Sequence, residues 1–124
     1  MPRPKKSPSA LRSPCPIAGA LDLLGDRWTL LIVRDLLRGR QRYGEFAEAP
    51  EGIPTNVLAD RLARLEARGL IASAPYQQNP PRYAYSLTPR GQELKPVLIS
   101  LAKWGARHVT GTRIPPEMSA AMER

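Results

Sequence analysis

The stretch from residue 52 to residue 87 constrains the fold more than any other part of the sequence. Three leucines recur there at helical spacing ahead of Gly69, so we predict an amphipathic helix over residues 54–68 that stops at this glycine. Two short runs rich in apolar and aromatic residues follow, separated by a polar tip at residues 77–81. In a winged helix, such a helix enters the major groove of DNA while the ribbon reaches the flanking backbone.

The residues before this stretch predict two longer helices. The first spans residues 17–24, and Gly25 is expected to end it at the C′ position. Asp26 is expected to cap the second helix, residues 27–38, by accepting a hydrogen bond from a free backbone N–H. Because this second helix is apolar over most of its circumference, we expect it to be the central helix of the core.

A short helical segment is expected between the central helix and residue 52. Residues 40–42 could form the edge of a third strand, and residues 43–49 are expected to form one or two helical turns. The side chains expected to face inward from these turns are Tyr43, Phe46 and Ala47.

A final helix is expected after the ribbon. Thr88 and Pro89 are suited to cap and begin it, it would run to about Val109, and Pro96 should kink it or break it in two. Residues 114–124 show no helical stripe and are expected to form a loose tail. The predicted fold class is α+β, mainly α: a winged helix-turn-helix with extra N- and C-terminal dimerisation helices.

The balance of charge favours a polyanionic partner. The chain carries 19 basic and 11 acidic residues, for a net charge of +8, which suits DNA, RNA or an anionic membrane surface. The longest aliphatic run, residues 30–33, is far too short to cross a bilayer, and we see no secretory signal. We therefore expect a cytoplasmic protein with no membrane partner, and the single cysteine fits a reducing compartment.

The usual catalytic constellations are missing from the sequence. It has one histidine, His108, and one cysteine, Cys15, with neither a Cys/His cluster for zinc nor a glycine-rich phosphate loop. We therefore expect no enzymatic activity, no catalytic residue, no metal site and no cofactor.

Candidate DNA contacts lie on the helix over residues 54–68 and on the ribbon. Asn56 in the first turn can pair with adenine, and small Ala59 would let the helix approach the bases closely. Arg61 lies near the apolar stripe, so it could equally anchor the helix to the ribbon. A solvated polar face on an ordinary core helix is the alternative. The predicted contacts to double-stranded DNA are Thr55, Asn56, Ala59, Arg61, Arg64, Arg42, Arg82 and Gln78.

The final helix carries more apolar surface than a three-helix core of this size needs. A helix with such a stripe usually covers a partner, and a two-fold dimer is the commonest closed solution. The alternative is that the helix folds back on its own domain. The predicted interface residues of the homodimer are Ile17, Leu21, Leu94, Leu98, Leu101 and Trp104.

Cys15 is a candidate redox-sensing residue. It directly precedes the first predicted helix, where a thiol can become more reactive toward oxidants. The alternative is a cysteine that only packs as a small hydrophobic residue.

The sequence resembles the HxlR-type family of bacterial winged-helix transcription regulators, relatives of the MarR group, from Cys15 to about Val109. The motifs that carry the resemblance are CP at residues 15–16, LDLLGDRW at 21–28, IPTNVLADRLARL at 53–65, GLI at 69–71, YAYSLTPRG at 83–91, PVL at 96–98 and WG at 104–105.

The resemblance implies a homodimer that controls transcription, often as a repressor, with the first and last helices forming the interface and residues 53–65 lying in the groove. Some relatives sense thiol-reactive compounds through a cysteine at the position of Cys15. The family pattern often has a further basic residue where this chain has Ala63. Residues 1–14 would be a flexible basic arm, residues 15–109 the HxlR-type winged-helix DNA-binding domain, and residues 110–124 a C-terminal tail.

Our hypothesis from the sequence is a sequence-specific transcription regulator, acting as a repressor and a homodimer on a pseudo-palindromic operator. One alternative is a thiol-redox or ligand sensor, with a small-molecule or oxidant effector, whose DNA binding is the readout through Cys15. Another is a winged-helix adaptor that binds RNA or protein.

Overall fold

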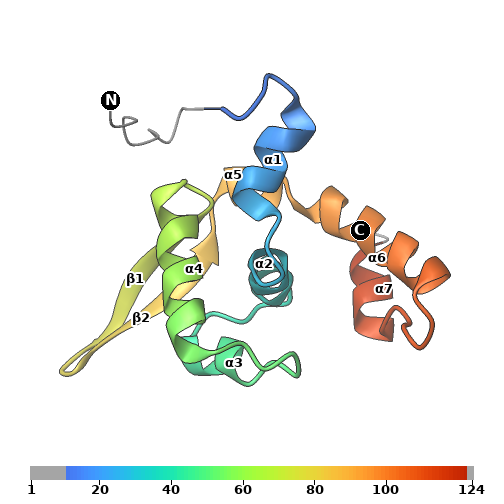
Figure 1. The fold of residues 1–124 in the computed structure, drawn as a ribbon. Coiled ribbons are helices and arrows are strands. Elements are labelled where there is room, and N and C mark those ends of the chain that lie inside the picture. Colours follow the sequence, from blue (N-terminus) through green and yellow to red (C-terminus); the bar gives the residue numbers. More distant parts are fainter. Residues whose placement is uncertain (1–10, 123–124) are drawn as a thin grey trace.

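The structure, a computed structural model, describes residues 11–122, so most of the predicted N-terminal arm lies outside the described residues (Figure 1). In chain order the elements are α1 (Pro16–Leu24), α2 (Thr29–Leu37), α3 (Tyr43–Ala47), α4 (Thr55–Ala67), β1 (Ile71–Gln78), β2 (Pro81–Leu87), α5 (Pro89–Gln92), α6 (Lys95–His108) and α7 (Pro116–Met122). Among these residues, no helix combines the length and the apolar character that crossing a membrane requires.

The hydrophobic core lies between α2, α3, α4 and the start of the ribbon. Leu58, Leu62 and Leu65 are buried, which confirms the predicted apolar stripe of α4. Val33 of α2 is fully buried as well, as expected for a central helix. The buried apolar residues are Leu24, Ile32, Val33, Leu36, Phe46, Ile53, Leu58, Leu62, Leu65, Leu70 and Ile71.

The junction between α1 and α2 depends on Gly25 and Asp26. Gly25 ends α1, but the expectation of a C′ glycine is wrong, since its φ is −81° and it is the C-cap. A Cβ at this position would overlap the main-chain oxygen of Leu21, so close packing requires the glycine. The Asp26 carboxylate accepts hydrogen bonds from the backbone N–H groups of Trp28 (3.0 Å) and Thr29 (3.1 Å), which confirms the predicted cap.

Helices α3 and α4 and the turn between them form the helix-turn-helix. Phe46 is buried as predicted, whereas Tyr43 is 37% exposed, so its expected inward position is wrong. Its hydroxyl instead donates a 2.6 Å hydrogen bond to the carbonyl oxygen of Thr55 at the start of α4. Glu51 in the turn accepts two hydrogen bonds from Arg34 of α2, at 2.8 and 2.9 Å, and this pairing lowers the pKa of Glu51. The turn is therefore held on the core from both sides.

Strands β1 and β2 form an antiparallel ribbon in which Ile71 pairs with Leu87. The register shifts between Pro75 and Gln77. The predicted third strand edge is reduced to a single bridge between Arg42 and the ribbon. This ribbon is the wing that the sequence predicts.

The C-terminal part differs from the prediction in one element. The final helix is broken into α5 and α6, with Pro96 in the first turn of α6, as its position suggests. The expectation of a loose tail is wrong for residues 116–122, which form α7. Glu117 in the first turn of α7 forms a 3.0 Å ion pair with Arg38 at the end of α2. A contact between residues so far apart in the chain leaves no periodic signal in the sequence.

Candidate nucleic-acid interface

The polar face of α4 is open to solvent along its N-terminal half. Thr55, Asn56 and Ala59 are exposed, while the leucine stripe of the same helix is buried. The first turn of α4 contains no acidic residue, so the partial positive charge of the helix N-terminus is not offset there. These features suit an approach to base edges and phosphates.

Arg61 is held inside the protein's own framework. Its Nε donates to Asp26 at 2.9 Å, and its guanidinium also pairs with Asp60. The expected alternative, an anchor between α4 and the wing, is wrong, because Arg61 ties α4 to the α1–α2 junction. Its expected contact with DNA is not tested by this geometry, but two carboxylates already neutralise its charge.

The charge state of Asp26 follows from the same cluster. Burial alone would raise the pKa of Asp26. The hydrogen bonds from the side chains of Thr29 and Arg61 and from two backbone amides outweigh this and lower the pKa to about 2. Asp26 is therefore a stable anion at neutral pH, and Arg61 is its fixed counter-ion.

Arg64 keeps more freedom than Arg61. Its guanidinium lies 3.9 Å from Asp60 one helical turn earlier, and 48% of its side chain is exposed. Such an exposed pair contributes little to stability, so Arg64 can turn to a phosphate at low cost. The negative charge of Asp60 alone would repel phosphates, but Arg61 and Arg64 both lie beside it and compensate this charge.

Strand β1 of the wing forms, toward its tip end, a contact that the sequence pattern did not predict. The Arg42 guanidinium lies 4.2 Å from the centre of the Tyr76 ring, over its face. Arg42 is the N-cap of α3, and its backbone N–H donates to Glu45 at 2.9 Å. The sequence signal that could have indicated this contact is the position of Tyr76, an aromatic residue directly before the predicted polar tip. Arg42 thus connects the helix-turn-helix with the wing.

The outer part of the wing presents a cation and two amides. Arg82 is exposed and pairs in register with Gln77, whose side chain donates a 3.0 Å hydrogen bond to the carbonyl oxygen of Pro80. Gln78 is exposed beside them. Within residues 11–122, no carboxylate forms an ion pair with Arg82. Its charge is therefore available for an external anion.

The predicted DNA contacts come from three elements that Figure 1 shows at one end of the molecule. The N-terminus of α4 lies beside α3, and the wing extends past them to its tip. Helices α1 and α6 lie away from this end. These three elements carry the exposed residues Thr55, Asn56, Ala59, Arg64, Arg42, Arg82 and Gln78. Arg61 of α4 is instead bound to Asp26 at the α1–α2 junction.

The predicted dimer residues fall into two groups. Ile17 and Leu21 of α1, and Leu101 and Trp104 of α6, are more than half exposed. By contrast, Leu94 and Leu98 pack against the chain's own core, so for these two residues the structure shows the packing that the alternative expected. The difference arises because α6 has two apolar sides, and only one of them faces solvent.

Cys15 is exposed and is the N-cap of α1. Its backbone N–H donates to the Ser13 hydroxyl at 3.1 Å. The thiol is therefore accessible to solvent in the isolated chain, and the alternative of a packed hydrophobic residue does not fit its exposure. In the described part of the chain, no three His, Cys, Asp or Glu side chains group as they would around a metal ion.

Comparison with known proteins places this geometry in a family. The model of the HxlR-like helix-turn-helix family matches residues 23–113. The chain belongs to this family. An uncharacterized HTH-type transcriptional regulator of Synechocystis sp. is 44% identical over 92 residues, which cover 74% of this chain and 68% of that protein. The chain matches only 63% of the length of similar regulators from Mycobacterium tuberculosis and Mycobacterium bovis.

Solved structures agree with this assignment. The chain superimposes on PA1607 with a TM-score of 0.73 and 35% identity, over 84% of this chain and 72% of the other. It superimposes on the redox regulator HypR in its oxidized form with a TM-score of 0.69 and 31% identity, over 82% of this chain and the whole of the other. The winged helix-turn-helix fold and the resemblance drawn from the sequence are thus confirmed. This HxlR-like chain is a DNA-binding transcription regulator and not an enzyme.

Proposed function

We propose that this HxlR-like protein is a sequence-specific repressor that binds a pseudo-palindromic operator as a homodimer. The observation that carries the proposal is the exposed, acid-free first turn of α4, on the same side of the molecule as the wing. Asn56 and Thr55 would read base edges, and Ala59 would keep the helix close to them.

The cationic side chains around α4 would contact the DNA backbone. Arg64 and Arg82 are exposed. Among residues 11–122, Arg64 has a single weak ion pair, with Asp60, and Arg82 has none, so both can neutralise phosphates. Gln78 would donate to phosphate or sugar oxygens beside Arg82. Arg42, stacked on Tyr76, would contact the backbone at the junction of α3 and the wing. Arg61 would orient α4 through Asp26 rather than neutralise a phosphate.

The homodimer is supported by the apolar surface of α1 and α6. Ile17 is 69% exposed and Trp104 is 61% exposed, and Leu21 and Leu101 lie on the same two helices. Exposed apolar side chains gathered on two helices are typical of an interface. A two-fold axis through them would set two α4 helices about one DNA turn apart. A chromosomal DNA target would be reached in the bacterial cytoplasm, where we propose that the protein acts.

Repression would follow from steric exclusion. A dimer that reads two half-sites occludes a stretch of DNA, and RNA polymerase cannot use a promoter that the stretch overlaps. The test is in vitro transcription from a template whose promoter overlaps the duplex sequence that the protein binds most tightly. The amount of transcript should fall as protein is added. An increase in transcript would contradict repression while leaving DNA binding intact.

The base-reading role of α4 can be tested with matched variants. Asn56→Ala should weaken binding to the tightest duplex recovered from a random pool by about 1–3 kcal/mol for each half-site that the dimer reads, with little effect on random duplex. Thr110→Ala, an exposed change far from α4 in sequence, is the control and should bind as wild type. Fluorescence anisotropy measures both. Equal losses on the two duplexes would refute the role of Asn56, and tighter binding to structured RNA would favour an RNA adaptor.

A second candidate function is redox sensing through Cys15. Its exposure at the N-terminus of α1, one of the proposed interface helices, favours this idea, as does the likeness to the redox regulator HypR. Oxidation there would change the dimer and with it the spacing of the two α4 helices. Oxidant should lower the DNA affinity of wild type and leave Cys15→Ser unchanged. Identical affinity of wild type with and without oxidant would remove the thiol switch.

A further inference from the structure

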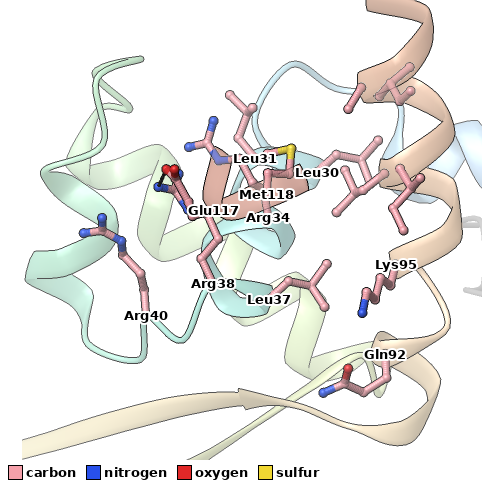
Figure 2. Close-up of a pocket in the computed structure, with 14 residues that line it drawn as sticks. Leu30, Leu31, Arg34, Leu37, Arg38, Arg40, Gln92, Lys95, Glu117 and Met118 are labelled. Carbon is pink, nitrogen blue, oxygen red and sulfur yellow. Dashed lines mark hydrogen bonds and ion pairs between the residues drawn. The ribbon is translucent and has the colours of Figure 1, made fainter. Parts of the chain in front are cut away.

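A cavity of about 620 Å³ lies between α2, α6 and α7 (Figure 2). Its volume is in the range of pockets that hold small organic ligands. The walls are mainly aliphatic, with Leu30 and Leu37 from α2, Leu98 from α6 and Met118 from α7. The cavity is thus suited to an apolar body of the size of a fused aromatic ring or a medium-length alkyl chain.

Four of the six polar side chains that line the cavity in the described part of the chain are cationic. Arg34 is already paired with Asp35 and Glu51, which leaves Arg38 and Arg40 after α2 and Lys95 at the start of α6. Among these described residues, Glu117 is the single carboxylate. Glu117 pairs with Arg38 at 3.0 Å, and Figure 2 shows this pair on the α7 side of the cavity. In the described residues, no carboxylate forms an ion pair with Arg40 or Lys95. Charge complementarity therefore favours an anionic head group.

We propose that this cavity binds a small amphipathic carboxylic acid, with its apolar body between α2 and α6 and its carboxylate beside Lys95. Lys95 is half-buried, so its ammonium would form a stronger ion pair than a fully exposed lysine.

The site would regulate DNA binding, a consequence that rests on the proposed function. Helix α2 belongs to the core that carries α4, and α6 carries part of the proposed dimer surface. A ligand bound between α2 and α6 would stabilise the distance between the two helices at which it makes the most contacts. It would therefore favour one geometry of the dimer over others. The spacing of the two α4 helices would shift with it.

The binding test uses the full chain and two matched probes, naphthylacetate and the uncharged naphthylethanol, in calorimetric titrations without DNA. The acid should bind at least about tenfold more tightly than the alcohol, because only the acid can form the charge-assisted hydrogen bonds. Lys95→Gln should remove this preference, and Lys103→Gln, on the exposed side of α6, should keep it. Ala102→Trp should fill the cavity and abolish binding of both probes.

Several results would overturn the proposal. The proposal is wrong if wild type binds neither probe, or if it binds the acid and the alcohol equally. It is also wrong if acid binding survives both Lys95→Gln and Ala102→Trp. If wild type binds no acid and Ala102→Trp changes only the dimer dissociation constant in sedimentation, a second copy of the chain covers this groove instead. DNA binding is measured on the same preparation. DNA binding without acid binding refutes this inference alone, and acid binding without DNA binding refutes the proposed function alone.

Discussion

Replacing Asp26 by Asn should destabilise the protein by about 1–2 kcal/mol at neutral pH. The carboxylate accepts hydrogen bonds from Arg61 at 2.9 Å and from two backbone amides at 3.0 and 3.1 Å. Asparagine keeps an oxygen that can cap α2, so the loss reports mainly the charge. The pair joins α4 to the α1–α2 junction, and the substitution therefore weakens the support of the recognition helix.

The magnitude follows from the pKa of Asp26. Folding lowers this pKa from 3.8 to about 2, and each unit corresponds to about 1.36 kcal/mol, which sets an upper limit near 2.4 kcal/mol. Because 26% of the side chain is exposed, solvent screening reduces the expected value. A lowered pKa means that the stabilisation is complete above the unfolded pKa. It is lost as the pH falls through the folded pKa.

Urea unfolding followed by tryptophan fluorescence measures the effect, since urea leaves ion pairs unscreened. The difference between wild type and Asp26→Asn should stay constant from pH 7 to about pH 5 and shrink steadily toward pH 2. Asp22→Asn is the control, because Asp22 forms only an exposed pair with Arg12 and should change stability by less than about 0.5 kcal/mol. A difference that persists or grows on acidification would refute this reading of Asp26.

Three further outcomes are expected. Arg82→Gln should reduce the slope of log affinity against log salt by about 1.8, about 0.9 for each copy in the proposed dimer, and an unchanged slope would remove Arg82 from the DNA contacts. Arg61→Gln should lower stability but leave the salt dependence of DNA binding nearly unchanged, because the Arg61 guanidinium is already paired with Asp26. A weaker salt dependence in this variant would show that Arg61 contacts a phosphate. Gly91→Ala should lower the free energy of unfolding by at least about 2 kcal/mol, measured by heat or urea, because a Cβ there would overlap the main-chain oxygen of Leu70. Gly44→Ala, where a Cβ would meet open space, should be neutral or slightly stabilising. Equal effects at the two glycines would show that the packing is looser than described.

Local sequence signals predicted the features that depend on neighbouring residues. The leucine stripe of α4, the Asp26 cap and the break at Pro96 each involve positions within a few residues of one another. Helical periodicity and capping chemistry act over that range, so the pattern and the structure agree.

Features that depend on distant residues escaped prediction. Arg61 is separated from Asp26 by 35 residues, and Glu117 from Arg38 by 79. Nothing in the local pattern distinguishes an arginine that will meet a carboxylate from one that will face DNA. The wrong prediction for Tyr43 has the same cause. Its hydroxyl donates a hydrogen bond to the carbonyl oxygen of Thr55, 12 residues later in the chain, and the ring does not pack inward. The candidate site was thus predictable as a surface, but the roles of individual cations on it were not.

Selection of bound sequences from random duplex DNA tests the central claim most directly, because it reports both the reading surface and the number of copies that use it. The account predicts a two-fold symmetric consensus whose half-sites lie about 10 base pairs apart, each read by one α4 helix. An asymmetric single half-site, or no enrichment over the starting pool in physiological salt, would contradict it.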